Sequence, residues 1–97
     1  MELTQLHRAL EAILFASGER IELKRLSEVL EADAKEVEAA CLELADDYAF
    51  QRRGMRILKL DSGFQMVSSG EMADYVTKAL ETRNSRRLRM LVPHIPP

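Results

Sequence analysis

Residues 55–68 read MRILKLDSGFQMVS, and this stretch holds two short apolar runs at residues 55–60 and 64–68. Asp61, Ser62 and Gly63 separate the two runs. A three-residue connection that contains glycine is a common loop between antiparallel strands. The stretch therefore predicts a β-hairpin, and the segments on either side of it decide which fold the hairpin completes.

Helical periodicity flanks the hairpin on both sides. Apolar residues recur every three or four positions over about residues 2–17, 23–30 and 34–50 before it, and over about residues 71–81 after it. The expected inward stripes are Leu3, Leu6, Leu10, Ile13 and Leu14; Leu23, Leu26 and Leu30; Val37, Ala40, Cys41, Leu44 and Tyr48; and Met72, Tyr75, Val76, Ala79 and Leu80. Gly18 predicts the end of the first helix, and Asp33 with Glu36 predicts a capping pair at the start of the third. Three helices, a hairpin wing and a C-terminal helix predict a winged helix-turn-helix, mainly α with a small β-hairpin.

The chain divides by charge and by composition near residue 82. Residues 1–82 carry ten basic and all sixteen acidic side chains, a net charge of −6, whereas residues 83–97 carry four arginines and no acid. Three prolines, at positions 93, 96 and 97, disfavour regular structure in that last segment. We therefore expect one winged-helix domain at residues 1–82 and a basic, irregular tail at residues 83–97.

Cysteine content and hydropathy indicate the compartment. Cys41 is the single cysteine, so no internal disulfide can form and a four-cysteine metal site is excluded. A small domain without disulfides fits a reducing environment. The N-terminus lacks the basic start and apolar run of a signal peptide, and no apolar run is long enough to span a membrane. We expect a cytoplasmic protein with no membrane partner.

Four short strings of the chain resemble the N-terminal domain of the segregation and condensation protein B family, bacterial partners of the SMC chromosome-condensing complex. These strings are LEAILFASGE at residues 10–19, RGM at residues 53–55, GFQM at residues 63–66 and ADYV at residues 73–76. Their order matches the family, and the resemblance covers about residues 3–82. One departure is Arg20, which stands where the family often has proline.

The resemblance implies a function in chromosome segregation, condensation and cell division. Such proteins have two tandem winged-helix domains, form homodimers through the first, and hold the kleisin subunit and through it the SMC ATPase, without a reaction of their own. The resemblance thus places the chain at the nucleoid. The second domain is absent from these 97 residues, and the family pattern ends near residues 83–88. This predicts a shortened gene or a non-native ending, and weaker kleisin binding.

Catalysis, a cofactor and a metal site have little support in the sequence. His7 and His94 lie at opposite ends of the chain, and we expect His7 to be an exposed helix residue. Cys41 falls on the inward stripe of the third helix, where a cysteine behaves as a small apolar core residue. No glycine-rich phosphate loop and no metal-ligand spacing occur. We expect no catalytic, cofactor-binding or metal-binding residues.

A small DNA-binding winged-helix regulator is the alternative. Groove entry would use the outer face of the third helix, which carries Lys35, Glu38, Ala39, Leu42, Glu43 and Asp46. Phosphates repel such an acidic surface. The basic positions are Arg52 and Arg53, which also fit a solvated turn, and the tail arginines Arg83, Arg86, Arg87 and Arg89. We therefore expect DNA contact to be weak and confined to the tail.

The second half of the first helix is the strongest positive indication of function. Between residues 9 and 16 only Glu11 is polar, and Ala9, Ala12, Phe15 and Ala16 lie largely beside the inward stripe. A helix that is apolar nearly all round is buried on more than one side. Either the fourth helix covers this second side within one chain, or another protein chain does. We favour a dimer or partner interface, because exposed apolar patches often mark contact surfaces.

Overall fold

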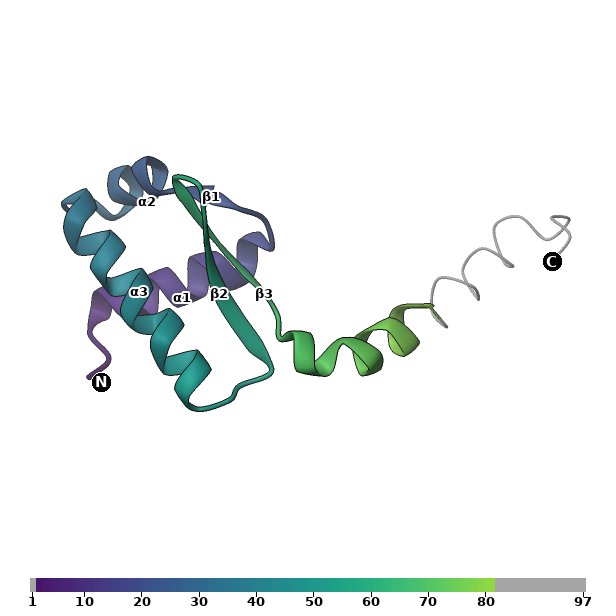
Figure 1. The fold of residues 1–97 in the computed structure, drawn as a ribbon. Coiled ribbons are helices and arrows are strands. Elements are labelled where there is room, and N and C mark those ends of the chain that lie inside the picture. Colours follow the sequence, from purple (N-terminus) through teal and green to yellow (C-terminus); the bar gives the residue numbers. More distant parts are fainter. Residues whose placement is uncertain (1, 82–97) are drawn as a thin grey trace, which may run out of the picture.

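Three helices and a three-stranded sheet make up the body of the protein (Figure 1). The computed structural model describes residues 2–81. The elements are α1 (Gln5–Ser17), β1 (Ile21–Glu22), α2 (Leu23–Leu30), α3 (Ala34–Phe50), β2 (Met55–Leu60), β3 (Gly63–Ser68), the 3₁₀ turn η1 (Gly70–Met72) and a helical stretch at residues 73–81. The predicted winged-helix order is confirmed. The predicted tail at residues 83–97 lies outside the described residues.

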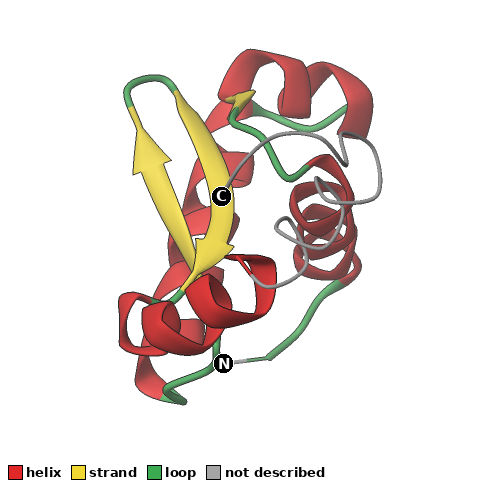
Figure 2. Ribbon diagram, turned by 90° about the vertical axis from the view of Figure 1, so that its right-hand side faces the viewer, coloured by secondary structure: helices red, strands yellow, loops and turns green. Residues whose placement is uncertain are grey.

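The core forms where the helices meet the hairpin, and the sheet lies along one side of the helices (Figure 2). All five residues of the stripe predicted for α3 are buried, as are Leu10 and Leu14 of α1 and Leu26 of α2. The hairpin adds Ile57, Phe64 and Met66, and Phe64 is 1% exposed. Burial of leucine and phenylalanine side chains contributes about 1.5–3 kcal/mol each. The hairpin therefore completes a core that the helices leave open.

The short strand β1, which the apolar pattern did not predict, explains why residue 63 is a glycine. β1 pairs with β3, with Ile21 opposite Phe64, so the strand order is β1-β3-β2. A Cβ atom at Gly63 would lie 2.6 Å from the backbone oxygen of Ile21, too close for any side chain. Gly63 belongs to β3 and is its first residue, so the loop expected at residues 61–63 is shorter than predicted. Asp61, in this turn, has a positive φ of 55°.

The start of α1 also differs from the prediction. The helix begins at Gln5, not near Glu2, and Leu3 lies outside it with 55% of its surface exposed. Thr4 is the N-cap: its hydroxyl oxygen accepts a hydrogen bond from the His7 amide, and its own amide donates to Nδ1 of His7 at 3.2 Å. His7 is therefore buried, 6% exposed, and not on the surface as expected.

His7 also ties α1 to α3. Its Nε2 lies 3.0 Å from the Glu43 carboxylate. Because Nδ1 accepts from Thr4, Nε2 carries the proton and donates to Glu43. One side chain thereby caps its own helix and joins a second one.

The predicted glycine at the end of α1 is confirmed, but the predicted capping pair at the start of α3 is not. Gly18 closes α1 with a φ of 66°, in the left-handed region that favours glycine. Asp33 occupies the N-cap position of α3, but its side chain makes no capping hydrogen bond, so the predicted pairing with Glu36 is wrong.

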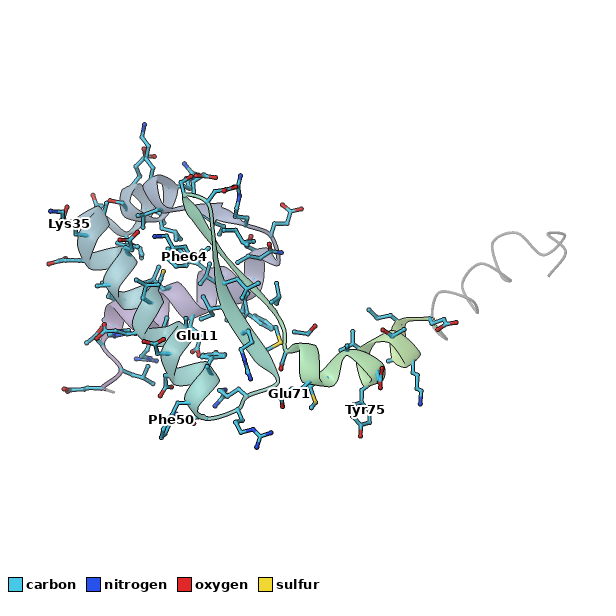
Figure 3. All side chains as sticks on the ribbon, in the orientation of Figure 1. Glu11, Lys35, Phe50, Phe64, Glu71 and Tyr75 are labelled. Carbon is cyan, nitrogen blue, oxygen red and sulfur yellow. The ribbon has the colours of Figure 1, made fainter. Side chains whose placement is uncertain are left out.

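The fourth helix does not pack on the core as predicted. Residues 70–81, here called the arm, extend away from the three-helix body (Figures 1 and 3). Tyr75 is 74% exposed, Leu80 is 49% exposed and Met72 is 37% exposed. The helical period correctly predicted an apolar stripe, but not that the body of the same chain leaves it uncovered.

Removing the His7 side chain should destabilise the fold. His7→Ala loses the acceptor for the Thr4 amide and the bond to Glu43, so we expect a loss of about 1–2 kcal/mol in the free energy of unfolding. His7→Gln should recover part of this loss, because glutamine at the same helix position can accept from the N-cap amide. Urea unfolding followed by circular dichroism measures the change, with exposed Arg8→Ala as the matched control. Equal losses for His7→Ala and Arg8→Ala would contradict this prediction.

Candidate protein-binding surface

The structure brings the four predicted interface residues together on one side of α1. Ala12, Phe15 and Ala16 are exposed and Ala9 is half-buried. Their spacings of three and four residues make them neighbours on the helix surface. Phe15 is 73% exposed, so the arm does not cover it within one chain, and that alternative from the sequence is wrong. This set, here called the α1 patch, is apolar surface that the core leaves free.

A groove of about 450 Å³ lies beside the α1 patch. Ala12 and Phe15 form its α1 side, and Met55 and Met66 of the hairpin form its other apolar wall. Glu11, Tyr48 and Arg53 supply the polar groups. We call this feature the α1 groove. Methionine and phenylalanine walls with a few polar groups are typical of a surface that binds a peptide or a helix.

The polar groups of the α1 groove hold one another in place. The Tyr48 hydroxyl donates to the Glu11 carboxylate, and the Arg53 guanidinium lies 5.2 Å from the centre of the Tyr48 ring. Burial, followed by the hydrogen bond to Glu11, raises the pKa of Tyr48 to about 12. The phenol therefore stays protonated and remains a donor at neutral pH. The groove thus presents one acid, Glu11, and one base, Arg53, beside the same tyrosine.

Reactive groups elsewhere have structural roles. Cys41 is fully buried, and burial followed by the charge of Glu38 raises the pKa of its thiol to about 11, which confirms that it is a core residue. A protonated, inaccessible thiol is a poor nucleophile. Among residues 2–81, no three histidine, cysteine or acidic side chains gather in a geometry that suits a metal ion. His94 lies outside the described residues.

The outer face of α3 is acidic, as the sequence predicted. Lys35, Ala39, Leu42, Glu43 and Asp46 are exposed and Glu38 is half-buried. Glu38 pairs with Lys59 of β2 at 3.2 Å, and Glu43 holds His7. The tail residues Arg83, Arg86, Arg87 and Arg89 lie outside the described residues. The helix that would enter a DNA groove in a winged-helix regulator thus carries the wrong charge for phosphates.

A second exposed aromatic residue was missed by the sequence analysis. Phe50, the last residue of α3, is 88% exposed (Figure 3). It lies at a shallow depression with Thr4 and His7, near the opposite end of α1 from Phe15. The rise of 1.5 Å per helical residue places Thr4 and Phe15 about 16 Å apart along α1.

Comparison with known proteins identifies the family. The model of the segregation and condensation complex subunit ScpB matches residues 8–91. The chain belongs to the ScpB family. The match reaches past residue 82, where the resemblance was expected to end. Segregation and condensation protein B of Alkaliphilus oremlandii is 31% identical over 86 residues, which cover 89% of this chain but 46% of that protein. The chain thus spans about half the length of the curated relatives it matches.

Solved structures agree with the winged-helix assignment. A crystal structure of a dimer of the ScpB N-terminal domain in complex with a ScpA peptide superposes with a TM-score of 0.70 at 31% identity. The superposed part covers 75% of this chain and 91% of the N-terminal domain in that crystal structure. ScpB from Mycobacterium tuberculosis gives a TM-score of 0.78 at 26% identity, over 87% of this chain and 54% of that one. The N-terminal half of ScpB is therefore the part to which this chain is similar.

Duplex DNA should bind this ScpB-family chain weakly and through the tail alone. The acidic outer face of α3 repels phosphates, whereas residues 83–97 carry four arginines and no acid. A chain that ends at Thr82 should lose the binding, and raising the salt concentration should weaken binding of the full chain steeply. Fluorescence anisotropy with labelled duplexes measures both effects. Tight, sequence-dependent binding by the shortened chain would reject this prediction and favour a DNA-reading function.

Proposed function

We propose that this chain is a dimerising protein-interaction module of the bacterial chromosome segregation and condensation complex. Two copies associate through α1 and hold the kleisin subunit, and through it the SMC ATPase. The proposed work is binding alone, in the cytoplasm at the nucleoid, with no reaction of its own. The observation that carries the proposal is the α1 patch, which presents Phe15 to solvent beside the α1 groove.

Physical chemistry favours a contact surface at this place. An aromatic side chain has about 150–250 Å² of surface to bury. Because Phe15 is 73% exposed, it leaves more than about 100 Å² of apolar area in water. Neighbouring alanines let another helix approach closely, and the polar groups of the α1 groove can fix its orientation. The relative whose N-terminal domain is a dimer with a ScpA peptide supports the same assignment.

The DNA-reading alternative gains no comparable support. Its recognition helix would be α3, whose outer face exposes Glu43 and Asp46, and these carboxylates repel phosphates. Among residues 2–81 the exposed Arg52 stands beside Glu71, which offsets its charge. Binding to proteins is the function that the described surface fits best.

The proposal predicts that a charge at Phe15 dissociates the dimer without unfolding the chain. Phe15→Glu places a carboxylate in an apolar contact, which costs several kcal/mol if the contact excludes water. Because Phe15 is 73% exposed in one chain, the monomer should keep its helical spectrum. Sedimentation at micromolar concentration measures association. Phe50→Glu is the matched control, since that phenylalanine is 88% exposed at the other end of α1. A monomeric wild type, or equal effects of the two variants, would refute the proposal.

A second prediction concerns kleisin affinity. Two linked binding domains gain from effective concentration, which can raise apparent affinity about 10²–10⁴-fold. We therefore expect these 97 residues to bind a central kleisin fragment weakly, and a version extended by a second winged-helix domain of the family to bind it more tightly. Calorimetric titration of both with the same fragment gives the two affinities. Equal affinities would show that this domain alone carries the contact.

A further inference from the structure

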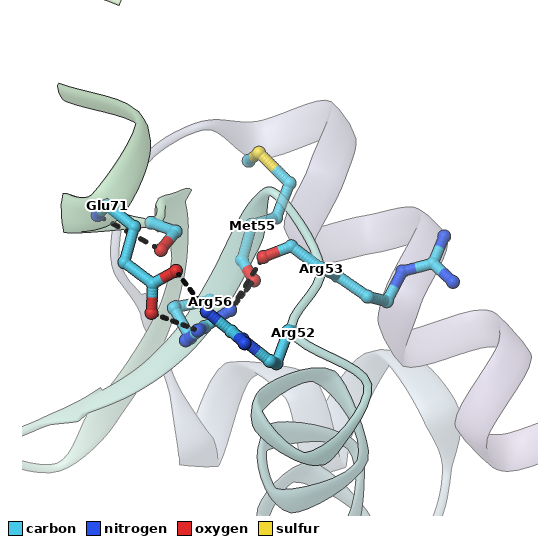
Figure 4. A network of polar contacts seen from close by, with 6 residues as sticks. Arg52, Arg53, Met55, Arg56 and Glu71 are labelled. Atoms are coloured by element: carbon cyan, nitrogen blue, oxygen red, sulfur yellow. Dashed lines mark hydrogen bonds and ion pairs between the residues drawn. The ribbon is translucent and has the colours of Figure 1, made fainter. Parts of the chain in front are cut away.

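Residues 69–71, where the arm joins the hairpin, make several contacts with the body. Ser69 is 3% exposed, its amide donates to the Gly54 carbonyl at 2.8 Å, and its hydroxyl oxygen accepts from the Glu71 amide. The Glu71 carboxylate lies 3.4 Å from a nitrogen of Arg52 and 3.9 Å from one of Arg56 (Figure 4). These contacts tie the first residues of the arm to the segment that precedes β2 and to β2 itself. They set the direction in which the arm leaves the hairpin.

The arm carries an apolar face that the described part of its own chain leaves largely open. Met72, Tyr75, Val76 and Ala79 follow one another at helical spacing, and Leu80 adjoins them. All five are exposed except Val76, which is half-buried. A helix this short is marginal in water and normally gains its stability by packing an apolar face. The arm therefore needs a partner surface outside the body to which it is attached.

The α1 groove has the chemistry that this face requires. Its walls are apolar, and its charged lining residues are Glu11 and Arg53, which both lie beside Tyr48. The arm carries Asp74 and Lys78 four residues apart, on either side of Tyr75 along the helix. An acid and a base on the arm thus match a base and an acid in the groove. Such charge complementarity fixes orientation and register in protein interfaces.

The expected contact area also suits two copies of this chain. In a two-fold dimer, each arm meets the other copy's groove, so every contact occurs twice. Phe15 and Tyr75 are each nearly three-quarters exposed, which leaves roughly 100–180 Å² per ring to bury. Four such rings with the flanking aliphatic residues approach the roughly 1,000 Å² that a specific interface needs.

We propose that two copies exchange arms, with the arm of each copy, residues 70–81, lying in the α1 groove of the other. This inference rests on the proposed dimer and names the elements that form it. The apolar stripe of the arm contacts the α1 patch, and Lys78 and Asp74 face Glu11 and Arg53 of the second copy. The dimer is then held by two apolar features, the α1 patch and the arm stripe, that the body of one chain leaves uncovered.

Cross-linking between two single-site variants tests the exchange. Ala12→Cys lies in the α1 groove and Ala79→Cys on the arm stripe, and both replace exposed alanines with a slightly larger side chain. One variant carries a size tag, the two are mixed at about 10 μM, and a short bismaleimide is added. We expect the mixed pair to link about a hundredfold faster than Ala39→Cys with Ala79→Cys, because a preformed contact gives millimolar effective concentration. Ala39 is an exposed alanine on the outer face of α3, and the wild type controls for Cys41.

The outcomes separate this inference from the proposed function. Equal linking rates in a chain that still sediments as a dimer would overturn the exchange and leave the dimer standing. Linking within one chain that carries both Ala12→Cys and Ala79→Cys, at concentrations where it is monomeric, would also overturn it. A wild type that is monomeric throughout would reject both proposals.

A second variant tests the arm without cross-linking. Tyr75→Glu should dissociate the dimer as Phe15→Glu does and retain the melting temperature of the monomer, because Tyr75 is 74% exposed. If Tyr75→Glu leaves the dimer intact and weakens binding of the kleisin fragment instead, the arm serves kleisin and the exchange is wrong.

Discussion

The packing of Phe64 into the helices is the contact on which the rest of the structure depends. This side chain is 1% exposed and enters from β3, the central strand, among residues of all three helices. β1 holds it in register through Ile21, and Gly63 permits the close approach of the two backbones. A chain of this size has a small core, so one large buried ring is a substantial part of it. The hairpin is therefore a structural part of the core as well as a wing.

The same packing decides which surfaces stay free. With the hairpin completing the core, the second side of α1 and the stripe of the arm have no place inside the body. Both remain apolar, and both carry an aromatic ring in water, Phe15 and Tyr75. Apolar area of this kind favours association, because burying it gains free energy that the monomer leaves unused. The proposed function thus rests on apolar surface that the core does not bury.

Charge then selects among the partners that a winged helix can have. The fold alone does not discriminate, since the same architecture serves DNA readers and protein binders. Here Glu43 and Glu38 stand on the outer side of α3 and are held by His7 and Lys59. Lys59 offsets the charge of Glu38, but the exposed Glu43 and Asp46 keep the surface that would approach a phosphate backbone acidic, while the α1 patch is apolar. The site favours a protein partner for electrostatic reasons that the fold does not dictate.

The sequence by itself determined the elements and most of the core, because helical and strand periods are local properties of the chain. The bounds of α2 and α3 and all five buried residues of α3 follow from spacing alone. The tertiary structure alone decided which residues that are distant in the sequence contact one another. It placed His7 against Glu43, paired β1 with β3, and left the arm outside the body although its apolar period resembles that of α3. Periodicity tells which face of a helix is apolar, but the three-dimensional packing of the whole chain decides what covers that face.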